Sequence, residues 1–186
     1  MEATTDGLPR RNARIAGVFY LLTIVTGSLS LAFATRGAEG LGAAFNLAST
    51  GCYVAVTLLF FSLFKPVDRT LSLIAACFSM VGCTIAALGV FQLAPAGISP
   101  LVFFGAYCLL IGVLILRSTF LPGFLGWLMM FGGLGWLTFL SPTLAGHLKP
   151  FNFIPGILGE LVLTVWLLVK SVDVERWRAQ ASAQRG

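Results

Sequence analysis

Six long runs of apolar residues, separated by short polar segments, take up most of this chain of 186 residues. They cover residues 15–34, 41–64, 70–91, 101–116, 124–140 and 153–169. A helix needs about 17–25 apolar residues to cross a bilayer, and the fourth run reaches that length only with its flanks. Because backbone groups in hydrocarbon must be satisfied within their own segment, these runs predict helices. They lack the alternation of a β-barrel strand. We therefore predict an all-α bundle of six transmembrane helices.

The composition excludes a water-soluble globular domain. Hydrophobic residues make up 58% of the chain, charged residues only 10%, and the mean hydropathy is +0.93. Soluble domains carry about 25% charged residues, so this chain has too little polar surface to cover a soluble body. The net charge of +5 does not indicate nucleic acid as a partner, because the basic residues lie at the ends of the apolar runs. Membrane lipids are the expected partners.

The distribution of basic residues predicts the orientation. Ten of them lie in the N-terminal segment, in the segments after the second and fourth runs, and in the C-terminal segment: Arg10, Arg11, Arg14, Lys65, Arg69, Arg117, Lys170, Arg176, Arg178 and Arg185. The opposite side holds only Arg36 and Lys149. Under the positive-inside rule both termini are cytoplasmic, which agrees with an even number of spans.

Three segments follow from this pattern. Residues 1–14 are the expected cytoplasmic N-terminal tail, 15–170 the six-helix transmembrane domain, and 171–186 an amphipathic cytoplasmic tail. We expect this last tail to extend the sixth helix and to anchor at the interface through Trp177 and its arginines. The first run ends on 32–34, Ala-Phe-Ala, which mimics a signal-peptide cleavage site. It is about 20 residues long, whereas signal cores have about 7–15, so a retained helix is predicted.

The sixth run carries Glu160 near its middle. At a rise of about 1.5 Å per residue, this carboxyl group lies about 11 Å from the start of the helix, close to the bilayer midplane. An ionisable group there costs at least about 2.5 kcal/mol, so it must face protein or water, or be protonated. Gly156 and Thr164 lie four residues to either side and share its helix face. This small and partly polar face is suited to close helix packing.

Two interpretations of Glu160 stay open. It is either a proton-titrating group or ligand contact, or a protonated side chain bonded across helices, with Asn46, Ser49 and Thr84 as donors. The hypothetical ligand or proton site consists of Glu160, Asn46, Tyr107 and Thr164, although packing alone accounts for Asn46 and Tyr107. Asn152 is expected to cap the sixth helix.

Other motifs give no catalytic, metal or cofactor site. His147 is the only histidine and lies in a loop, so it cannot build a typical zinc site. The four cysteines, Cys52, Cys77, Cys83 and Cys108, lie inside apolar runs without a CxxC pair and are interpreted as packing residues. The glycines of the fifth run lack the GKS or GKT of a phosphate loop and favour close helix packing instead.

Three blocks of the sequence resemble a known family. RNARIAGVFYLLTIVTGSLS, LVFFGAYCLLIGVLILRSTFLPGFLGWLMMFGGLGWL and PGILGELVLTVWLLVK are similar to successive blocks of a family of small bacterial multi-pass membrane proteins known as a domain of unknown function. The resemblance runs from Arg11 to Lys170, with LxxRSxxLPxxLG and PGxxGE as its more specific parts. It implies a bacterial cytoplasmic membrane and one helical domain, but no activity. Family members often have His where Tyr107 stands and a longer segment before the fourth span, which speaks against a His–Glu pair.

The function has three readings. We prefer a small accessory or structural membrane protein that binds lipid, an apolar ligand or a membrane-protein partner, either as a homo-oligomer or in a larger complex. The first alternative is a proton-coupled small-molecule carrier that uses Glu160. The second is an intramembrane enzyme that acts on a lipid-like substrate, which requires a second positioned group beside Glu160. An enzyme is the less expected class, since no catalytic set is visible.

Overall fold

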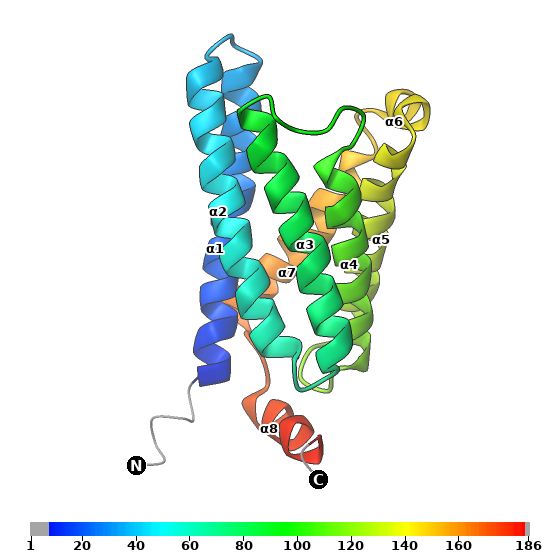
Figure 1. Cartoon of the computed structure of the whole chain (residues 1–186). Coiled ribbons are helices and arrows are strands. Elements are labelled where there is room, and N and C mark those ends of the chain that lie inside the picture. The colour runs from blue at the N-terminus through cyan, green and yellow to red at the C-terminus, as the bar shows by residue number, and fades with distance from the viewer. Residues whose placement is uncertain (1–7, 185–186) are drawn as a thin grey trace.

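The computed structural model describes residues 8–184 and consists of helices joined by short turns (Figure 1). In chain order the elements are α1 (Leu8–Ala34), α2 (Glu39–Phe64), α3 (Arg69–Val90), α4 (Pro100–Arg117), α5 (Gly123–Leu137), the 3-10 turn η1 (Thr138–Leu140), α6 (Pro142–Leu148), α7 (Phe153–Val169) and α8 (Val174–Ala183). The six predicted apolar runs all form helices, with ends that differ by one or two residues except at the start of α1 and the end of α5. The prediction of an all-α polytopic bundle is confirmed.

Five helices within the described chain are long and apolar enough to cross a membrane. They are α1, α2, α3, α4 and α5 continued by η1 as Gly123–Leu140. The helix α7 has 17 residues and passes the same test only together with α6, from which it is bent by 78°. The bundle therefore has five spanning helices, or six if α6 and α7 form one broken span. An isolated α7 is about 25 Å long, slightly less than the hydrocarbon thickness.

The long helices form a closed ring. Each helix from α1 to α5 packs against the next one in the chain, and α7 packs against both α5 and α1. Figure 1 shows α7 crossing the back of the bundle diagonally, from α1 at the lower end to α5 at the upper end. The helices α7 and α1 pack closely at Gly17, where a Cβ atom would lie 3.1 Å from Leu168 and 3.2 Å from Leu167. The tilt of α7 therefore separates it from α1 toward the other end of the ring.

Glycines set the distance between α4 and α5. Gly105 and Gly112 on α4 are seven residues apart, as are Gly126 and Gly133 on α5. A Cβ atom at Gly133 would lie 2.7 Å from the carbonyl oxygen of Gly105, and one at Gly126 would lie 2.7 Å from that of Gly112. No side chain fits at these positions, so the two backbones approach closely. The interpretation of the fifth run as a packing helix agrees with this geometry.

Small polar residues join the first three helices. Ser30 of α1 donates to the carbonyl of Gly42 at 2.8 Å, and Ser49 of α2 donates to the carbonyl of Thr23 at 3.0 Å. The hydroxyls of Thr57 on α2 and Ser79 on α3 are 2.5 Å apart and buried. In a bilayer, where helices gain no hydrophobic driving force from association, such bonds and close packing hold them together.

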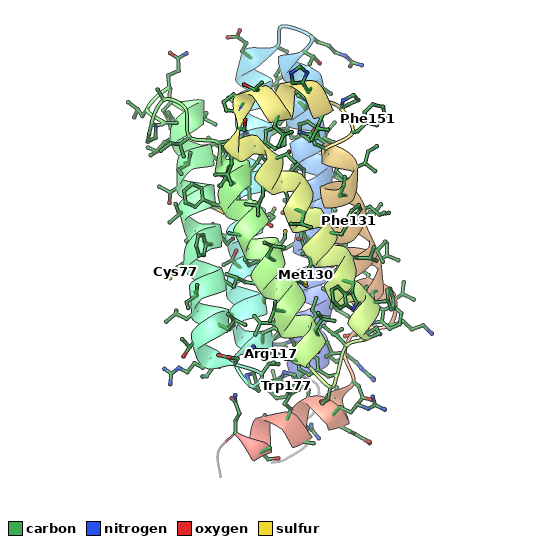
Figure 2. The ribbon with its side chains drawn as sticks, turned by 90° about the vertical axis from the view of Figure 1, so that its right-hand side faces the viewer. Cys77, Arg117, Met130, Phe131, Phe151 and Trp177 are labelled. Atoms are coloured by element: carbon green, nitrogen blue, oxygen red, sulfur yellow. The ribbon has the colours of Figure 1, made fainter. Side chains whose placement is uncertain are left out.

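The outer surface of the ring is apolar. Large hydrophobic side chains are exposed on α1, α2, α3, α5 and α7. Phe131 and Phe151, which are labelled in Figure 2, are examples from α5 and from the segment before α7. A surface of this kind requires a lipid environment, since a soluble protein rarely exposes so large an apolar area.

One end of the bundle collects the basic residues, and we call it the basic end. It comprises the start of α1, the α2–α3 and α4–α5 turns, and α8 (Figure 1). Arg117 forms an ion pair with Asp68 across the two turns at 3.2 Å, and Ser171 donates to the backbone carbonyl of Arg10 at 3.1 Å. Both described ends of the chain therefore lie on the same side, as the charge pattern predicts. Arg185 lies outside the described residues.

The two terminal segments differ from their expected forms. The N-terminal segment 1–14 was expected as a tail, but α1 already begins at Leu8, and residues 1–7 lie outside the described part. The C-terminal segment does not continue α7. Ser171 adopts a positive φ of 62°, and α8 then runs beneath the bundle (Figure 2). The predicted interface anchor Trp177 instead donates its indole N–H to the carbonyl of Leu63 at 2.9 Å. It satisfies one of the free carbonyls at the end of α2.

A polar cavity beside Glu160

A cavity of about 360 Å³ lies inside the ring, in the half away from the basic end. The polar residues of its lining come mainly from α1 and α2; they are Thr23, Ser28, Ser30, Asn46, Ser49 and Thr50. The aromatic residues of its lining come one each from α2, α4, α5 and α7; they are Tyr53, Phe104, Trp136 and Phe153. Glu160 on α7 is the only charged residue among the lining residues. The cavity thus combines an apolar wall, a row of hydroxyl groups and a single carboxyl group, as small-molecule sites commonly do.

Glu160 is held by two donors from neighbouring helices. The indole N–H of Trp136 on α5 donates to Oε1 at 3.3 Å, and the thiol of Cys108 on α4 donates to the same oxygen at 3.6 Å. No described residue bonds Oε2. The carboxyl group is therefore fixed through Oε1. Its other oxygen, Oε2, remains available to a molecule in the cavity.

The position of Trp136 depends on Gly156. A Cβ atom at Gly156 would overlap the indole ring, and one at Gly159 would lie 2.6 Å from the carbonyl oxygen of Leu128. Gly132 and Gly135 of α5 meet the backbone of α7 in the same seam. These glycines bring α5 and α7 close enough for the indole to lie flat on α7 one turn before Glu160. The PGxxGE block therefore supplies the carboxyl group together with the space for its donor.

Three tyrosines surround the inner side of Glu160. Tyr20, Tyr53 and Tyr107 come from α1, α2 and α4 and are at most 5% exposed. The ring of Tyr53 lies 5.7 Å from that of Tyr20 and 5.8 Å from that of Tyr107. None of the three hydroxyls has a hydrogen-bond partner among the described residues. Buried hydroxyls normally find a partner, so this cluster marks a place where water or a ligand completes the bonding.

The cavity is closed toward the basic end. Tyr20, Phe60, Phe64, Leu163 and Leu167 are fully buried inside the ring below Glu160. These side chains belong to one hydrophobic cluster of buried residues, which packs below the cavity.

The cavity is open toward the bilayer between α1 and α7. Its lining includes Ser28 and Leu31 of α1 and Ile157 of α7, all of which are exposed on the outside of the ring. These residues lie where the tilt of α7 separates it from α1. A molecule dissolved in the surrounding lipid thus has a route to Glu160 that does not cross the packed end of the ring.

The predicted site residues have different positions. Asn46 lines the cavity with Glu160, and its amide oxygen lies 3.5 Å from the hydroxyl of Thr50. Tyr107 is buried behind Glu160, in the tyrosine cluster. Thr164 donates to the backbone carbonyl of Glu160 at 2.7 Å and does not line the cavity. The structure thus brings Asn46 and Glu160 to one cavity, whereas the hydroxyl of Thr164 bonds within its own helix.

Two expectations about hydrogen bonding are wrong. Glu160 bonds neither Asn46, Ser49 nor Thr84; Thr84 donates to Met80 on its own helix. Asn152 makes no side-chain cap for α7 and instead donates to the hydroxyl of Thr138 at 3.1 Å. The donors to Glu160 are instead Trp136 and Cys108.

Sequence reasoning missed the two donors to Glu160. Trp136 was passed over within a glycine-rich packing helix, and Cys108 was interpreted as an apolar packing residue. The available signal was the matching small residues on the fifth and sixth runs, Gly132 and Gly135 opposite Gly156 and Gly159. They predict a close seam, and Trp136 lies beside that seam. His147 lies exposed on α6, away from this site.

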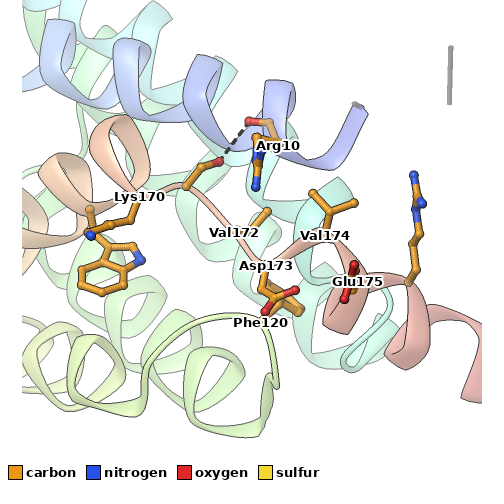
Figure 3. A pocket seen from close by; sticks show the side chains of 10 residues that line it. Arg10, Phe120, Lys170, Val172, Asp173, Val174 and Glu175 are labelled. Carbon is orange, nitrogen blue, oxygen red and sulfur yellow. Dashed lines mark hydrogen bonds between the residues drawn. The ribbon is translucent and has the colours of Figure 1, made fainter. Parts of the chain in front are cut away.

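A second cavity, of about 660 Å³, lies at the basic end between α8 and the bundle (Figure 3). Its lining carries both signs of charge, with Arg10 and Lys170 alongside Asp173 and Glu175. Asp173 caps α8 and pairs with Arg176 at 3.4 Å. Its charged groups thus include the cap of α8, and its aromatic lining consists of Phe120 and Trp166.

Comparison with known families gives one match. Residues 96–171 match the family model Domain of unknown function (DUF4386). The resemblance noted in the sequence is therefore confirmed for this stretch of the chain. The matched stretch of the DUF4386 family covers α4, α5 and α7, including Cys108, Trp136 and Glu160, and is shorter than the expected Arg11–Lys170. No curated protein and no solved structure matches the chain.

Proposed function

We propose that this integral membrane protein binds a small amphipathic molecule in the cavity beside Glu160. The observation that carries the proposal is the coincidence, in one cavity, of an opening to lipid and an unpartnered carboxylate oxygen. The apolar part of the ligand lies between α1 and α7, and its polar group reaches Glu160 and the hydroxyls of α1 and α2. A bacterial cytoplasmic membrane is the proposed location, and membrane lipid is the proposed source of the ligand.

A volume of about 360 Å³ supports this size class. Ligand sites in proteins range over about 300–1,000 Å³, so this one takes a small molecule or the head of a lipid, with the remaining chain outside the ring. The three unpartnered tyrosine hydroxyls add hydrogen-bonding capacity next to the carboxyl group. A purely structural Glu160 would not need an adjacent cavity open to the bilayer.

The experiment is extraction in a mild uncharged detergent followed by mass analysis of the bound small molecules. Ala86 lines the cavity, so Ala86→Phe fills it, whereas Val81→Phe adds the same ring on the lipid-facing side of the same helix. We expect one bound molecule per chain in the wild type and in Val81→Phe, and none in Ala86→Phe. A wild-type protein without ligand, or a ligand kept by Ala86→Phe, would contradict the proposal.

The second candidate is an intramembrane enzyme. It is favoured by one observation, the contact between the thiol of Cys108 and the carboxyl group of Glu160 at 3.6 Å in a site open to lipid. Cys108 is 1% exposed and does not line the cavity, however, so its sulfur does not reach a ligand there. We therefore favour binding without turnover. If the extracted ligand is a converted form of the molecule supplied, and Cys108→Ala stops the conversion, the protein is an enzyme and the proposal of binding without turnover is wrong.

A carrier is less well supported. Transport past Glu160 requires the five large side chains below it, Tyr20, Phe60, Phe64, Leu163 and Leu167, to separate. In liposomes we expect no uptake of the bound molecule and no proton flux. Uptake that is lost in Glu160→Gln would establish the carrier instead.

A further inference from the structure

The cavity wall contains one acidic side chain and no basic side chain. Glu160 is the only charged residue in its lining, and it takes part in neither of the ion pairs found in residues 8–184. The basic residues lie at the ends of the helices and not in the cavity wall. A carboxylate held away from bulk water without a cation is costly, so a positively charged ligand would reduce that cost.

Two pairs of aromatic rings share the cavity with the carboxyl group. The ring centres of Tyr53 and Phe104 are 4.7 Å apart, and those of Trp136 and Phe153 are 5.7 Å apart. All four line the cavity. The faces of such rings attract a cationic nitrogen, most strongly where water is excluded. Aromatic side chains grouped around one carboxylate form a typical site for an ammonium group.

The hydrogen-bonding groups agree with a cationic donor. The site offers acceptors that have no donor: Oε2 of Glu160 and the hydroxyl oxygen of Tyr53, which is buried and unpartnered. Serine and threonine hydroxyls of α1 and α2 can also accept. The only fixed donors at the carboxyl group, Trp136 and Cys108, are already used on Oε1. An anionic ligand would meet repulsion from Glu160 and no basic side chain.

We propose that the ligand of this cavity carries a positively charged nitrogen, with Glu160 as its counter-ion and Tyr53, Phe104, Trp136 and Phe153 as its aromatic cage. This inference rests on the proposed function and specifies the class of ligand. The ammonium group lies against Oε2, and an apolar chain leaves between α1 and α7. A free hydrophobic amine and the amine headgroup of a lipid share this chemistry.

The test uses the purified chain in uncharged maltoside micelles and three probes with the same chain, namely octyltrimethylammonium, 1-octanol and octyl sulfate. Binding is measured by calorimetry, and dioleoylphosphatidylethanolamine is added in a separate arm to represent a lipid headgroup. We expect the cation to bind at least about tenfold more tightly than octanol, because a desolvated cage favours charge, and octyl sulfate more weakly than both. Displacement of the cation by the lipid identifies the headgroup as the source, and its absence identifies a free amine.

Variants separate charge from shape. Glu160→Gln should lose about tenfold or more in affinity for the cation and leave octanol binding unchanged, whereas Glu175→Gln, which removes the same charge at the basic end, should change neither. Thermal unfolding of each variant controls for folding. Tyr53→Phe keeps the ring but removes the hydroxyl, and it is tested with octylammonium as an additional probe. It should weaken binding of octylammonium, which donates N–H bonds, more than that of octyltrimethylammonium, which has no N–H.

The outcomes distinguish this inference from the proposed function. Equal affinity for cation and octanol in the wild type, with Ala86→Phe abolishing both, would overturn the cationic ligand and leave the binding cavity in place. If no probe binds, or if Ala86→Phe has no effect on any of them, the binding function itself fails. Since the comparison of probes needs only the wild-type protein, it does not depend on Glu160→Gln folding.

Discussion

The indole ring of Trp136 lies on Gly156 and donates its N–H to Glu160, one helical turn further along α7. The glycine supplies the space, the tryptophan supplies the donor, and the carboxyl group is held at the wall of a cavity that opens to lipid. Gly156 on α7 and Trp136 on α5 thus position the carboxyl group of Glu160. The relationship gives the first two predictions.

Replacing Gly156 with alanine should destabilise the fold. Because a Cβ atom there overlaps the indole ring, Trp136 must move, at a cost of about 1–3 kcal/mol in the free energy of unfolding. Gly51 is the matched control, since a Cβ atom there meets nothing within 4 Å. Gly51→Ala should leave stability unchanged or slightly increased. Denaturation in micelles measures both, and equal stability of the two variants would contradict the packing that we describe.

The bond between Trp136 and Glu160 should appear as a coupling energy. In a double-mutant cycle with Trp136→Phe and Glu160→Met, we expect about 0.6–1.7 kcal/mol, the range found for hydrogen bonds between membrane helices. A control cycle pairs Trp166→Phe with Glu160→Met, because Trp166 packs against Phe124 and makes no bond to Glu160. Its coupling should be near zero. Similar coupling in the two cycles would show that the indole bond is not specific.

Asp68 should contribute to stability as a helix cap and not as an ion pair. It accepts a bond from the backbone N–H of Leu71 at 2.9 Å and pairs with the exposed side chain of Arg117. Asp68→Asn keeps a capping side chain and should change the free energy of unfolding by less than about 0.5 kcal/mol, whereas Asp68→Ala should cost about 1 kcal/mol. Chemical denaturation at low and high salt measures the free energy of unfolding of the wild type and of both variants. A large loss in Asp68→Asn that disappears at high salt would assign the stability to the ion pair.

Trp177 should hold α8 against the bundle. Its indole N–H bonds the carbonyl of Leu63, so Trp177→Phe removes the bond while keeping most of the apolar contact. We expect faster hydrogen exchange in α8 and in the α2–α3 turn, with no change in the cores of α4 and α5. Trp127→Phe serves as the control, because Trp127 is 65% exposed on the outer surface. Unchanged exchange in α8 would mean that other contacts dock it.

The orientation should follow the positive-inside rule. In a cysteine-free background, a single cysteine at Gly97 in the α3–α4 loop should react with an impermeant maleimide from outside the cell. A single cysteine at Lys65 in the α2–α3 turn should react only after the membrane is permeabilised. The two sites lie at opposite ends of the bundle, so each controls for the other. The reverse pattern would invert the topology.

Much of the fold could be predicted from the sequence because the solvent dictates it. A run such as 41–64 has no alternative in hydrocarbon to a helix that satisfies its own backbone, and the observed helix Glu39–Phe64 agrees with it. Glu160 was identified for the same reason, since a carboxyl group within an apolar run is expensive wherever it lies. These properties depend on single segments. Of the residues in the hypothetical site, Asn46 lines the cavity with Glu160, whereas Thr164 bonds within its own helix.

The tertiary structure decided what depends on pairs of helices. The ring order, the tilt of α7 away from α1, and the burial of Tyr20 beside Tyr53 follow from which glycines face which side chains. A helix gains little by turning one apolar face rather than another toward lipid, so periodicity along the sequence does not fix its rotation. Close approach at Gly156 does fix it, because only one rotation places Trp136 there. By itself, the sequence determined that this chain is a membrane helix bundle with one carboxyl group inside. The contacts between helices decided that this group lines a cavity and which side chains hold it.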